Sequence, residues 1–311
     1  MITETANAAS RKAILALADS SRLDHLVRRH GMRLGAARFV AGETLDQLVP
    51  VLRRLNDQGL ATNTTLLGEH VHTPEESRAV VDAYREILDR IAAERLRTNV
   101  ALKLTHLGLD LDEQIAYENV ATLAGHAAGL GNFVRIDMEE SQWVDATLRI
   151  FRRLREAGHE TTGTVLQSYL YRSEQDLESL LGLKPNLRFV KGAYLEPPDV
   201  AYPEKTDVDA ALLRLVERSL GEGGFTAIAT HDEAIIDQAI AIVERDGIPR
   251  ERFQFQMLYG VRPQLQLDLV RRGFDVLVAT PFGPDWYRYL MRRLAERPAN
   301  TLFFLKNLVR G

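Results

Sequence analysis

The sequence predicts an α/β protein: a (β/α)8 barrel of the TIM type, preceded by an N-terminal helical arm. Three observations support this prediction. About eight apolar runs of strand length recur along the chain, helical patterns separate them, and no long linker divides the 311 residues. Strands that alternate with helices pair in parallel through crossovers. Because such a barrel typically needs about 250 residues, one barrel and one arm account for the whole length.

The elements follow in order along the chain. Residues 1–35 form the predicted arm, in which 11–35 have a basic helical pattern, and residues 36–311 form the barrel domain. Strands are expected at 60–67, 99–104, 132–138, 160–167, 187–194, 225–231, 252–258 and 274–280. Helical patterns fill the connections, for example over 74–96 and 232–247.

A two-domain Rossmann enzyme is the alternative fold. It is disfavoured because the chain lacks a G-x-G-x-x-G motif that follows a strand; Gly129-Leu130-Gly131 precedes one instead.

The composition excludes several classes of function. The chain is 45% hydrophobic and 26% charged, with a net charge of −4 and no long basic block, so nucleic acid is not an expected partner. It contains no cysteine, which excludes disulfides, cysteine nucleophiles, iron–sulfur clusters and thiolate zinc sites. No signal-peptide pattern is present, and no apolar run approaches the roughly 20 residues of a membrane-spanning helix. We therefore expect a cytoplasmic protein.

Polar side chains lie at the ends of six consecutive predicted strands, where a TIM barrel has its active site. They are Lys103, Arg135, Asp137, Gln167, Tyr169, Arg188, Lys191, Thr230, His231 and Gln256. Each one alone is equally well explained by a strand end that reaches water, whereas the series indicates one cation-rich pocket. No metal site is expected, since the histidines show neither HxH nor HExxH spacing, and no G-x-S-x-G elbow is present.

Two short segments at these strand ends favour a flat, phosphorylated ligand. Gly192 and Ala193 are small enough for such a ligand to press against the backbone, although an ordinary turn explains the glycine equally well. Thr230 and His231 end a strand just before a helix, whose first-turn amides attract anions. Lys103 and Lys191 are also compatible with Schiff-base lysines, which barrel aldolases carry at strand ends.

A charged turn occurs in the last helical pattern, MRRLAERPAN, at 291–300. Glu296 lies three and four positions from Arg293 and Arg292, so all three share one helix face. A solvated ion-pair cluster is the ordinary interpretation. The alternative is that both arginines grip a carboxylate, which suits their fork of donors, while Glu296 takes an ammonium.

Six segments resemble, in order, the motifs of proline dehydrogenases: ALKLTHLG, VRIDMEES, LRFVKGAYLEP, ATHD, FQFQMLYG and YLMRRLAERPAN. The resemblance spans roughly residues 36–310, and FVKGAYLEP together with RRLAERPAN is highly specific. It implies a distorted TIM barrel that holds FAD non-covalently. It also implies the first step of proline catabolism, oxidation of L-proline to 1-pyrroline-5-carboxylate by hydride transfer to flavin N5.

The resemblance further implies roles for the matching charged residues. Arg292, Arg293 and Lys103 would bind the substrate carboxylate, and Glu296 would lock the last helix closed as a lid through ion pairing. The two expected catalytic residues are Asp137, which would help to hold that arrangement, and Arg188, which would lie beside flavin N5.

The remaining matches concern the flavin and the substrate ring. Flavin contacts are expected from Met138, Gln167, Lys191, Gly192, Ala193, Thr230 and His231. Leu258 and Tyr259 are expected in the apolar wall around the substrate ring.

Ala279 departs from the family pattern. The eighth strand of the family usually reads V-Y-x-P-x-G, whereas this chain has VATPFG, so Ala279 replaces a tyrosine that packs on the proline ring. Hydroxyproline dehydrogenases, a sister group, also use a small residue there. A hydroxyproline or other cyclic amino-acid dehydrogenase is therefore the first alternative function.

Two further alternatives come from other classes: a Schiff-base aldolase that uses Lys103 or Lys191, and a sensor barrel that binds an amino acid without turnover. For the favoured function, the resemblance implies a membrane quinone as electron acceptor and peripheral contact with the inner face of the membrane. The chain carries no recognisable aldehyde dehydrogenase domain, so a separate 1-pyrroline-5-carboxylate dehydrogenase is the expected second partner.

Overall fold

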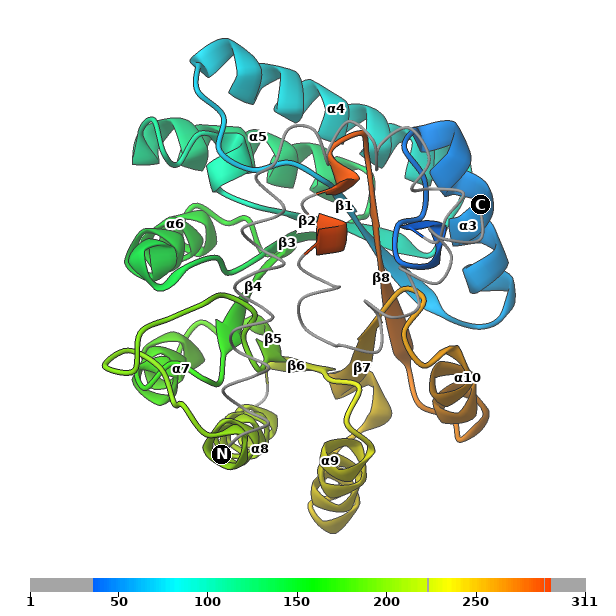
Figure 1. Ribbon diagram of the computed structural model, residues 1–311, viewed down its shortest axis with the longest axis vertical. Coiled ribbons are helices and arrows are strands. Elements are labelled where there is room, and N and C mark those ends of the chain that lie inside the picture. The colour runs from blue at the N-terminus through cyan, green and yellow to red at the C-terminus, as the bar shows by residue number, and fades with distance from the viewer. Residues whose placement is uncertain (1–35, 223, 288, 292–311) are drawn as a thin grey trace.

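The computed structural model describes residues 36–222, 224–287 and 289–291. Eight parallel strands close into a barrel in sequence order, and β8 pairs with β1 (Figure 1). The strands are β1 (Ala61–Leu66), β2 (Thr98–Leu102), β3 (Val134–Ile136), β4 (Thr162–Gln167), β5 (Asn186–Val190), β6 (Phe225–Ala229), β7 (Phe253–Leu258) and β8 (Val276–Phe282). The predicted barrel is confirmed, and the Rossmann alternative is wrong.

Helices form a ring around the strands, as the view down the barrel shows (Figure 1). They are α3 (Leu45–Asp57), α4 (Pro74–Ala93), α5 (Glu113–Gly129), α6 (Val144–Glu156), α7 (Ser173–Leu181), α8 (Lys205–Gly221), α9 (Glu233–Arg245) and α10 (Pro263–Arg271). Single 3-10 turns occur at η1 (Ala36–Arg38), η2 (Thr105–Leu107), η3 (Ser141–Trp143) and η4 (Arg250–Arg252). The predicted arm, 1–35, and the lid residues Arg292, Arg293 and Glu296 lie outside the described residues.

Local sequence explains where several helices begin. Thr44 and Thr73 cap α3 and α4, and each threonine side chain accepts a hydrogen bond from a backbone N–H in the first turn. Pro74 follows Thr73 at the first helical position, where a missing N–H has no cost. Asp112 caps α5 in the same way through two backbone amides. Thr73 and Asp112 thus mark the ends of the loops that follow β1 and β2.

Strand β7 shows how the sequence divides the barrel wall into two faces. Phe253 and Phe255 alternate with Gln254 and Gln256, so the rings and the amides point to opposite sides of the sheet. The two rings pack against Phe274 in the buried core, whereas Gln256 accepts a hydrogen bond from Arg188 on β5 and Gln254 donates one to Asp275, just before β8. The barrel interior is therefore polar along this strand.

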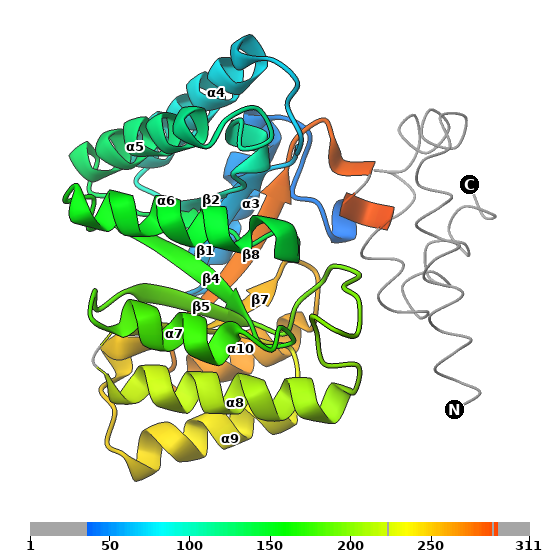
Figure 2. The ribbon, with the colours of Figure 1, turned by 90° about the vertical axis from the view of Figure 1, so that its left-hand side faces the viewer.

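A small apolar cluster lies at the C-terminal ends of the strands. It joins residues before α3 to the helical turn after β8: Ala36, Phe39, Val40, Leu67, Trp286, Tyr287, Leu290 and Met291. Figure 2 shows these two segments side by side at one end of the barrel. Trp286 also donates from its Nε1 to Glu43 over 2.7 Å. Within the part of the chain that the structure describes, no helix is both long and apolar enough to cross a bilayer.

Candidate active site

A cavity of about 1370 Å³ occupies the mouth of the barrel. It is larger than the roughly 300–1,000 Å³ of ordinary small-molecule sites. Each of the eight strands, or the segment that directly follows it, contributes to the lining. The lining includes the predicted residues Lys103, Asp137, Met138, Gln167, Arg188, Lys191, Gly192, Ala193, Thr230, His231, Leu258 and Ala279. Of the polar strand-end residues expected in one pocket, all but Arg135 and Tyr169 line this cavity.

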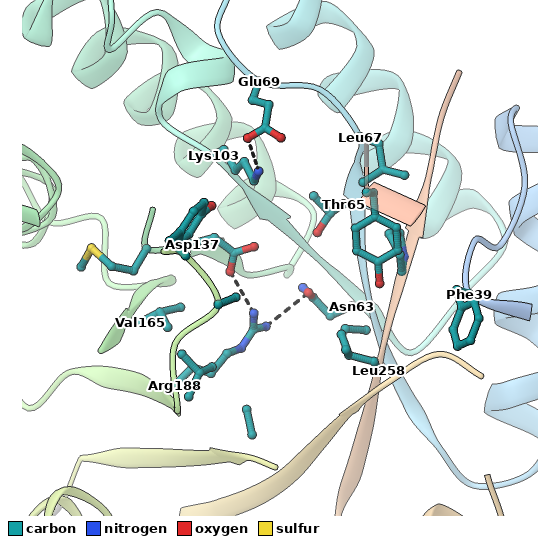
Figure 3. Close-up of a pocket in the computed structure, with 18 of the residues that line it drawn as sticks. Phe39, Asn63, Thr65, Leu67, Glu69, Lys103, Asp137, Val165, Arg188 and Leu258 are labelled. Carbon is teal, nitrogen blue, oxygen red and sulfur yellow. Dashed lines mark hydrogen bonds and ion pairs between the residues drawn. The ribbon is translucent and has the colours of Figure 1, made fainter. Parts of the chain in front are cut away.

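Arg188 on β5 is held by three acceptors, Asp137, Asn63 and Gln256. Figure 3 shows the bonds to Asp137 and Asn63. Arg188 Nη1 donates to Asp137 Oδ1 over 2.9 Å, its Nη2 to Asn63 Oδ1 over 3.2 Å, and its Nε to Gln256 Oε1 over 2.6 Å. Burial lowers the pKa of this guanidinium, and the Asp137 carboxylate opposes that change. Because a guanidinium is not deprotonated in proteins, the group stays charged. Arg188 is thus a fixed, buried cation in the cavity.

Lys103, just after β2, forms the second charged contact of the site. Its Nζ lies 2.9 Å from Glu69 Oε2, which belongs to the loop between β1 and α4 (Figure 3). His106 lines the same part of the cavity, and burial followed by the nearby Lys103 charge lowers its pKa to about 4. The loop approaches this ring closely at Gly68, where a Cβ atom would overlap the imidazole. At neutral pH the site therefore holds an uncharged imidazole beside an ion pair.

A second group of ion pairs lies at the ends of β5 and β6. Lys191 Nζ is 2.6 Å from Asp209 Oδ1 and 3.2 Å from Asp232 Oδ2, and Lys205 contacts the same two carboxylates. Burial alone would raise the pKa of Asp232, but the hydrogen bonds from Lys205 and Lys191 outweigh it and lower that pKa. Two lysines therefore line one side of the cavity.

The segment after β5 explains why Gly192 is a glycine. Its φ is +118°, in the region that side chains avoid, and a Cβ atom there would overlap the ring of Tyr169. We expected a ligand to press against the backbone here, but on the side where a Cβ atom would point, the Tyr169 ring already occupies that space. Gly192 and Ala193 still line the cavity with their other atoms.

Hydrogen bonds fix the other residues expected to contact a ligand. Leu258 N–H donates to His231 Nε2 over 2.8 Å, so the proton of a neutral His231 lies on Nδ1. Thr230 Oγ1 accepts from the backbone N–H of Asp232 at the start of α9. Gln167 donates from Nε2 to two backbone carbonyls, while its buried Oε1 has no hydrogen-bond partner among the described residues.

Tyr259 requires a correction. It is not among the residues that line the cavity, and its hydroxyl accepts from Arg54 on α3 over 3.2 Å. Its N–H donates to Ala279, so it continues the β7 ladder beyond Leu258. Adjacent residues on a strand face opposite sides, and Leu258 takes the inward one. The prediction that both form the substrate wall is wrong for Tyr259.

Sequence reasoning did not identify two residues of the site. Asn63 lies within the polar strand ATNTTL, and an amide at an inward strand position was its one signal. Glu69 follows β1 in a loop, and nothing in the sequence pairs it with Lys103. Arg135, grouped with the strand ends above, instead donates to Thr164 and Asn186 in the buried interior and does not line the cavity.

Comparison with known proteins places this arrangement in a family. The family described as proline dehydrogenase matches residues 48–306. Proline dehydrogenase 2 of Bacillus subtilis is 41% identical over 301 residues, which cover 97% of this chain and 99% of that protein. Proline dehydrogenase of Deinococcus radiodurans is 42% identical, covering 97% of this chain and 98% of its own.

A solved structure supports the fold. Proline utilization A from Bdellovibrio bacteriovorus superposes with a TM-score of 0.81 at 24% identity, and the match covers 94% of this chain and 37% of that one. With the family match over most of the barrel and two relatives above 40% identity along nearly their whole length, this chain belongs to the proline dehydrogenase family.

Proposed function

We propose that this chain is an FAD-dependent proline dehydrogenase that oxidises L-proline to 1-pyrroline-5-carboxylate, the first step of proline catabolism. Enzymes of this family are flavin-dependent in general. The observation that carries the proposal is the triple hold on Arg188 in a cavity large enough for a dinucleotide and a small amino acid. A cation fixed in this way suits a site where negative charge develops during the reaction.

The residues present fit a flavin. The unpartnered Oε1 of Gln167 offers an acceptor to an N–H of a bound ring system. Lys191 and Lys205 line the same cavity and suit the phosphates of a dinucleotide. Met138, Gly192, Ala193, Thr230 and His231 complete the proposed contact set. When bound, FAD would supply the hydride acceptor at N5, and Arg188 is the residue that we assign beside it.

For the substrate, the chain must bind a zwitterion and exclude water. Lys103 is the described cation that we assign to the proline carboxylate, and Glu69 holds its ammonium at the cavity wall. Leu258 and Ala279 line the apolar side. Arg292 and Arg293 are proposed to complete the carboxylate site, with Glu296 closing the lid. Closure of such a lid removes water before hydride transfer.

The geometry favours one alternative function and disfavours another. Ala279 leaves open the space that a tyrosine occupies in the family pattern, which favours hydroxyproline dehydrogenase as the second candidate. A Schiff-base aldolase is disfavoured because Lys103 and Lys191 are already engaged by carboxylates. A Schiff-base lysine needs a neutral amine, usually desolvated among apolar groups or next to another cation.

The proposal extends to two partners. We propose a membrane quinone as the electron acceptor and a separate 1-pyrroline-5-carboxylate dehydrogenase as the enzyme that consumes the product. Bifunctional protein PutA of Escherichia coli is 25% identical over 317 residues, which is 24% of its own length. The name of that relative indicates two activities in one chain, and we propose that the second of these lies on a separate chain here.

The test is the visible spectrum of the purified protein under anaerobic conditions, before and after L-proline and then trans-4-hydroxy-L-proline. A flavin spectrum bleached by proline is the expected result. Bleaching by hydroxyproline alone would favour the second candidate. A colourless protein that binds no added FAD would overturn the proposal, and borohydride trapping of a lysine adduct would then support the aldolase.

A further inference from the structure

A chain of hydrogen bonds runs from the candidate active site through the barrel interior to its opposite end. Arg188 Nε donates to Gln256 Oε1 over 2.6 Å, and Gln256 Nε2 donates to Gln254 Oε1 over 2.7 Å. Gln254 Nε2 in turn donates to Asp275 Oδ2 over 2.6 Å. Three successive bonds therefore connect the guanidinium to a carboxylate.

The chain follows one inward face of β7 and ends near the surface. Gln254 and Gln256 are two positions apart on that strand and are 8% and 4% exposed. Asp275 directly precedes β8, so it lies at the N-terminal end of the barrel, away from the cavity. There its second oxygen pairs with Arg97, whose side chain is 57% exposed.

The two ends of this chain determine its direction. A guanidinium can only donate and a carboxylate can only accept, whereas each glutamine offers one donor group and one acceptor. If both amides were flipped, Gln256 would present its NH₂ to the Nε–H of Arg188, and Gln254 would present its oxygen to Asp275. Both contacts would be repulsive, so only the observed orientation satisfies all four side chains.

This direction matters because of how Arg188 is held. Asp137 and Asn63 accept from the two Nη atoms, and Gln256 alone accepts from Nε. The bond at Nε is therefore the one that stops the guanidinium plane from rotating about the line through its two Nη atoms. A carboxylate at the far end also polarises each amide in turn and strengthens the successive bonds.

We propose that Asp275 and Gln254 are positioning residues for the oxidation: they orient the Gln256 amide, which sets the plane of the Arg188 guanidinium. Neither contacts the cavity, so their effect is transmitted through the hydrogen-bond chain. The inference rests on the proposed place of Arg188 beside the flavin.

The test compares Asp275→Leu and Gln254→Leu with the wild type, each as the flavin-loaded enzyme. Both variants should slow flavin reduction by proline on the order of tenfold, less than the ~10² that a 1 Å misplacement can cost. Both should shift the midpoint potential of the bound flavin to more negative values, with KM unchanged. Because one break suffices, the double variant should be no slower than either single variant.

Two further variants separate positioning from stability. Arg97→Leu removes the ion pair at the same end but leaves the Asp275 acceptor, so rate and potential should match the wild type. Asp275→Asn keeps an acceptor oxygen and should recover most of the rate lost in Asp275→Leu. It also serves as the test if the leucine variant does not fold.

The outcomes distinguish this inference from the proposed function. A wild-type protein that binds no flavin, or whose flavin proline does not reduce, overturns the proposed function and this inference with it. A proline-reducible wild type whose Asp275 and Gln254 variants keep its rate and potential overturns the positioning role alone. Losses that add in the double variant would show two independent structural effects, and would overturn it as well.

Discussion

The Nζ of Lys103 lies 2.9 Å from the Oε2 of Glu69, and their side chains are only 15% and 12% exposed. Two charges so far from water have lost most of their hydration, and each compensates the other. Removal of Glu69 takes from the buried Lys103 ammonium the carboxylate that compensates its charge, which is much more costly than the loss of a surface ion pair.

Glu69→Ala is therefore expected to lower the free energy of unfolding by about 3 kcal/mol. It should also raise KM for proline, since the Lys103 ammonium loses the carboxylate that holds it at the cavity wall. Urea unfolding and steady-state kinetics measure the two effects. The matched control is Glu75→Ala, whose ion pair with Arg78 is 74% and 62% exposed, and which should cost less than about 1 kcal/mol. Equal costs for the two variants would contradict the prediction.

Arg188→Lys tests whether geometry or charge alone is needed at the centre of the site. A lysine keeps the positive charge but lacks the planar fork that bonds Asp137, Asn63 and Gln256 together. We expect flavin reduction by proline, followed by stopped-flow absorbance, to slow on the order of 10²-fold. Arg214→Lys changes an exposed arginine that pairs with Glu174 and should have no effect. A wild-type rate in Arg188→Lys would remove this residue from the chemistry.

His106 should make stability fall in mild acid. Burial, and then the charge of Lys103, lower its pKa from 6.5 to about 4, so the folded protein binds this proton less readily than the unfolded chain. The contribution of His106 to stability is therefore fully present above its pKa in the unfolded chain. It is lost as the pH falls toward its pKa in the folded protein. Between about pH 7.5 and pH 5 the loss due to this residue is about 2 kcal/mol.

The measurement is urea unfolding at those two pH values for the wild type and His106→Gln, which cannot titrate. The wild type should lose more stability than the variant by the amount given above. His126→Gln is the control, because His126 is more exposed and hydrogen-bonded to Asp89, so that variant should follow the wild type. An identical pH dependence in His106→Gln would mean that this ring is not the group responsible.

The fold was largely predictable because each strand has a local signal. The alternation in FQFQML and the apolar runs of the other strands identify all eight, with boundaries within a few residues. The last strand was expected at 274–280 and spans Val276–Phe282. Its start lies later because Phe274 and Asp275 belong to the segment before the strand, at the N-terminal end of the barrel.

The site was less predictable because its contacts cross the barrel. Lys103 and Arg188 were identifiable as polar strand-end residues, but their partners Glu69 and Asn63 lie 34 and 125 positions away in the chain. Only closure of the barrel brings them together. Tyr259 failed for a local reason: the resemblance matched it beside Leu258, whereas alternation along a strand sends the two side chains to opposite faces.

Ala279 is expected to set the preference between proline and trans-4-hydroxy-L-proline. It lines the cavity and, by strand register, lies between Asn63 on β1 and Leu258 on β7. Ala279→Tyr adds an aromatic ring to this wall, which should bury more of the proline ring and stabilise its complex by about 1–2 kcal/mol. KM for proline should fall by roughly tenfold. The same ring should crowd the 4-hydroxyl group, so kcat/KM for trans-4-hydroxy-L-proline should fall.

The ratio of kcat/KM for the two substrates is the quantity to measure, because a change in folded fraction cancels from it. Ala279→Ser is the matched control: it adds one oxygen and no ring, so it cannot gain the apolar contact with proline. An unchanged ratio in Ala279→Tyr, with the flavin still bound, would place the substrate ring elsewhere in the cavity. In that case Ala279 would no longer be a reason to consider hydroxyproline.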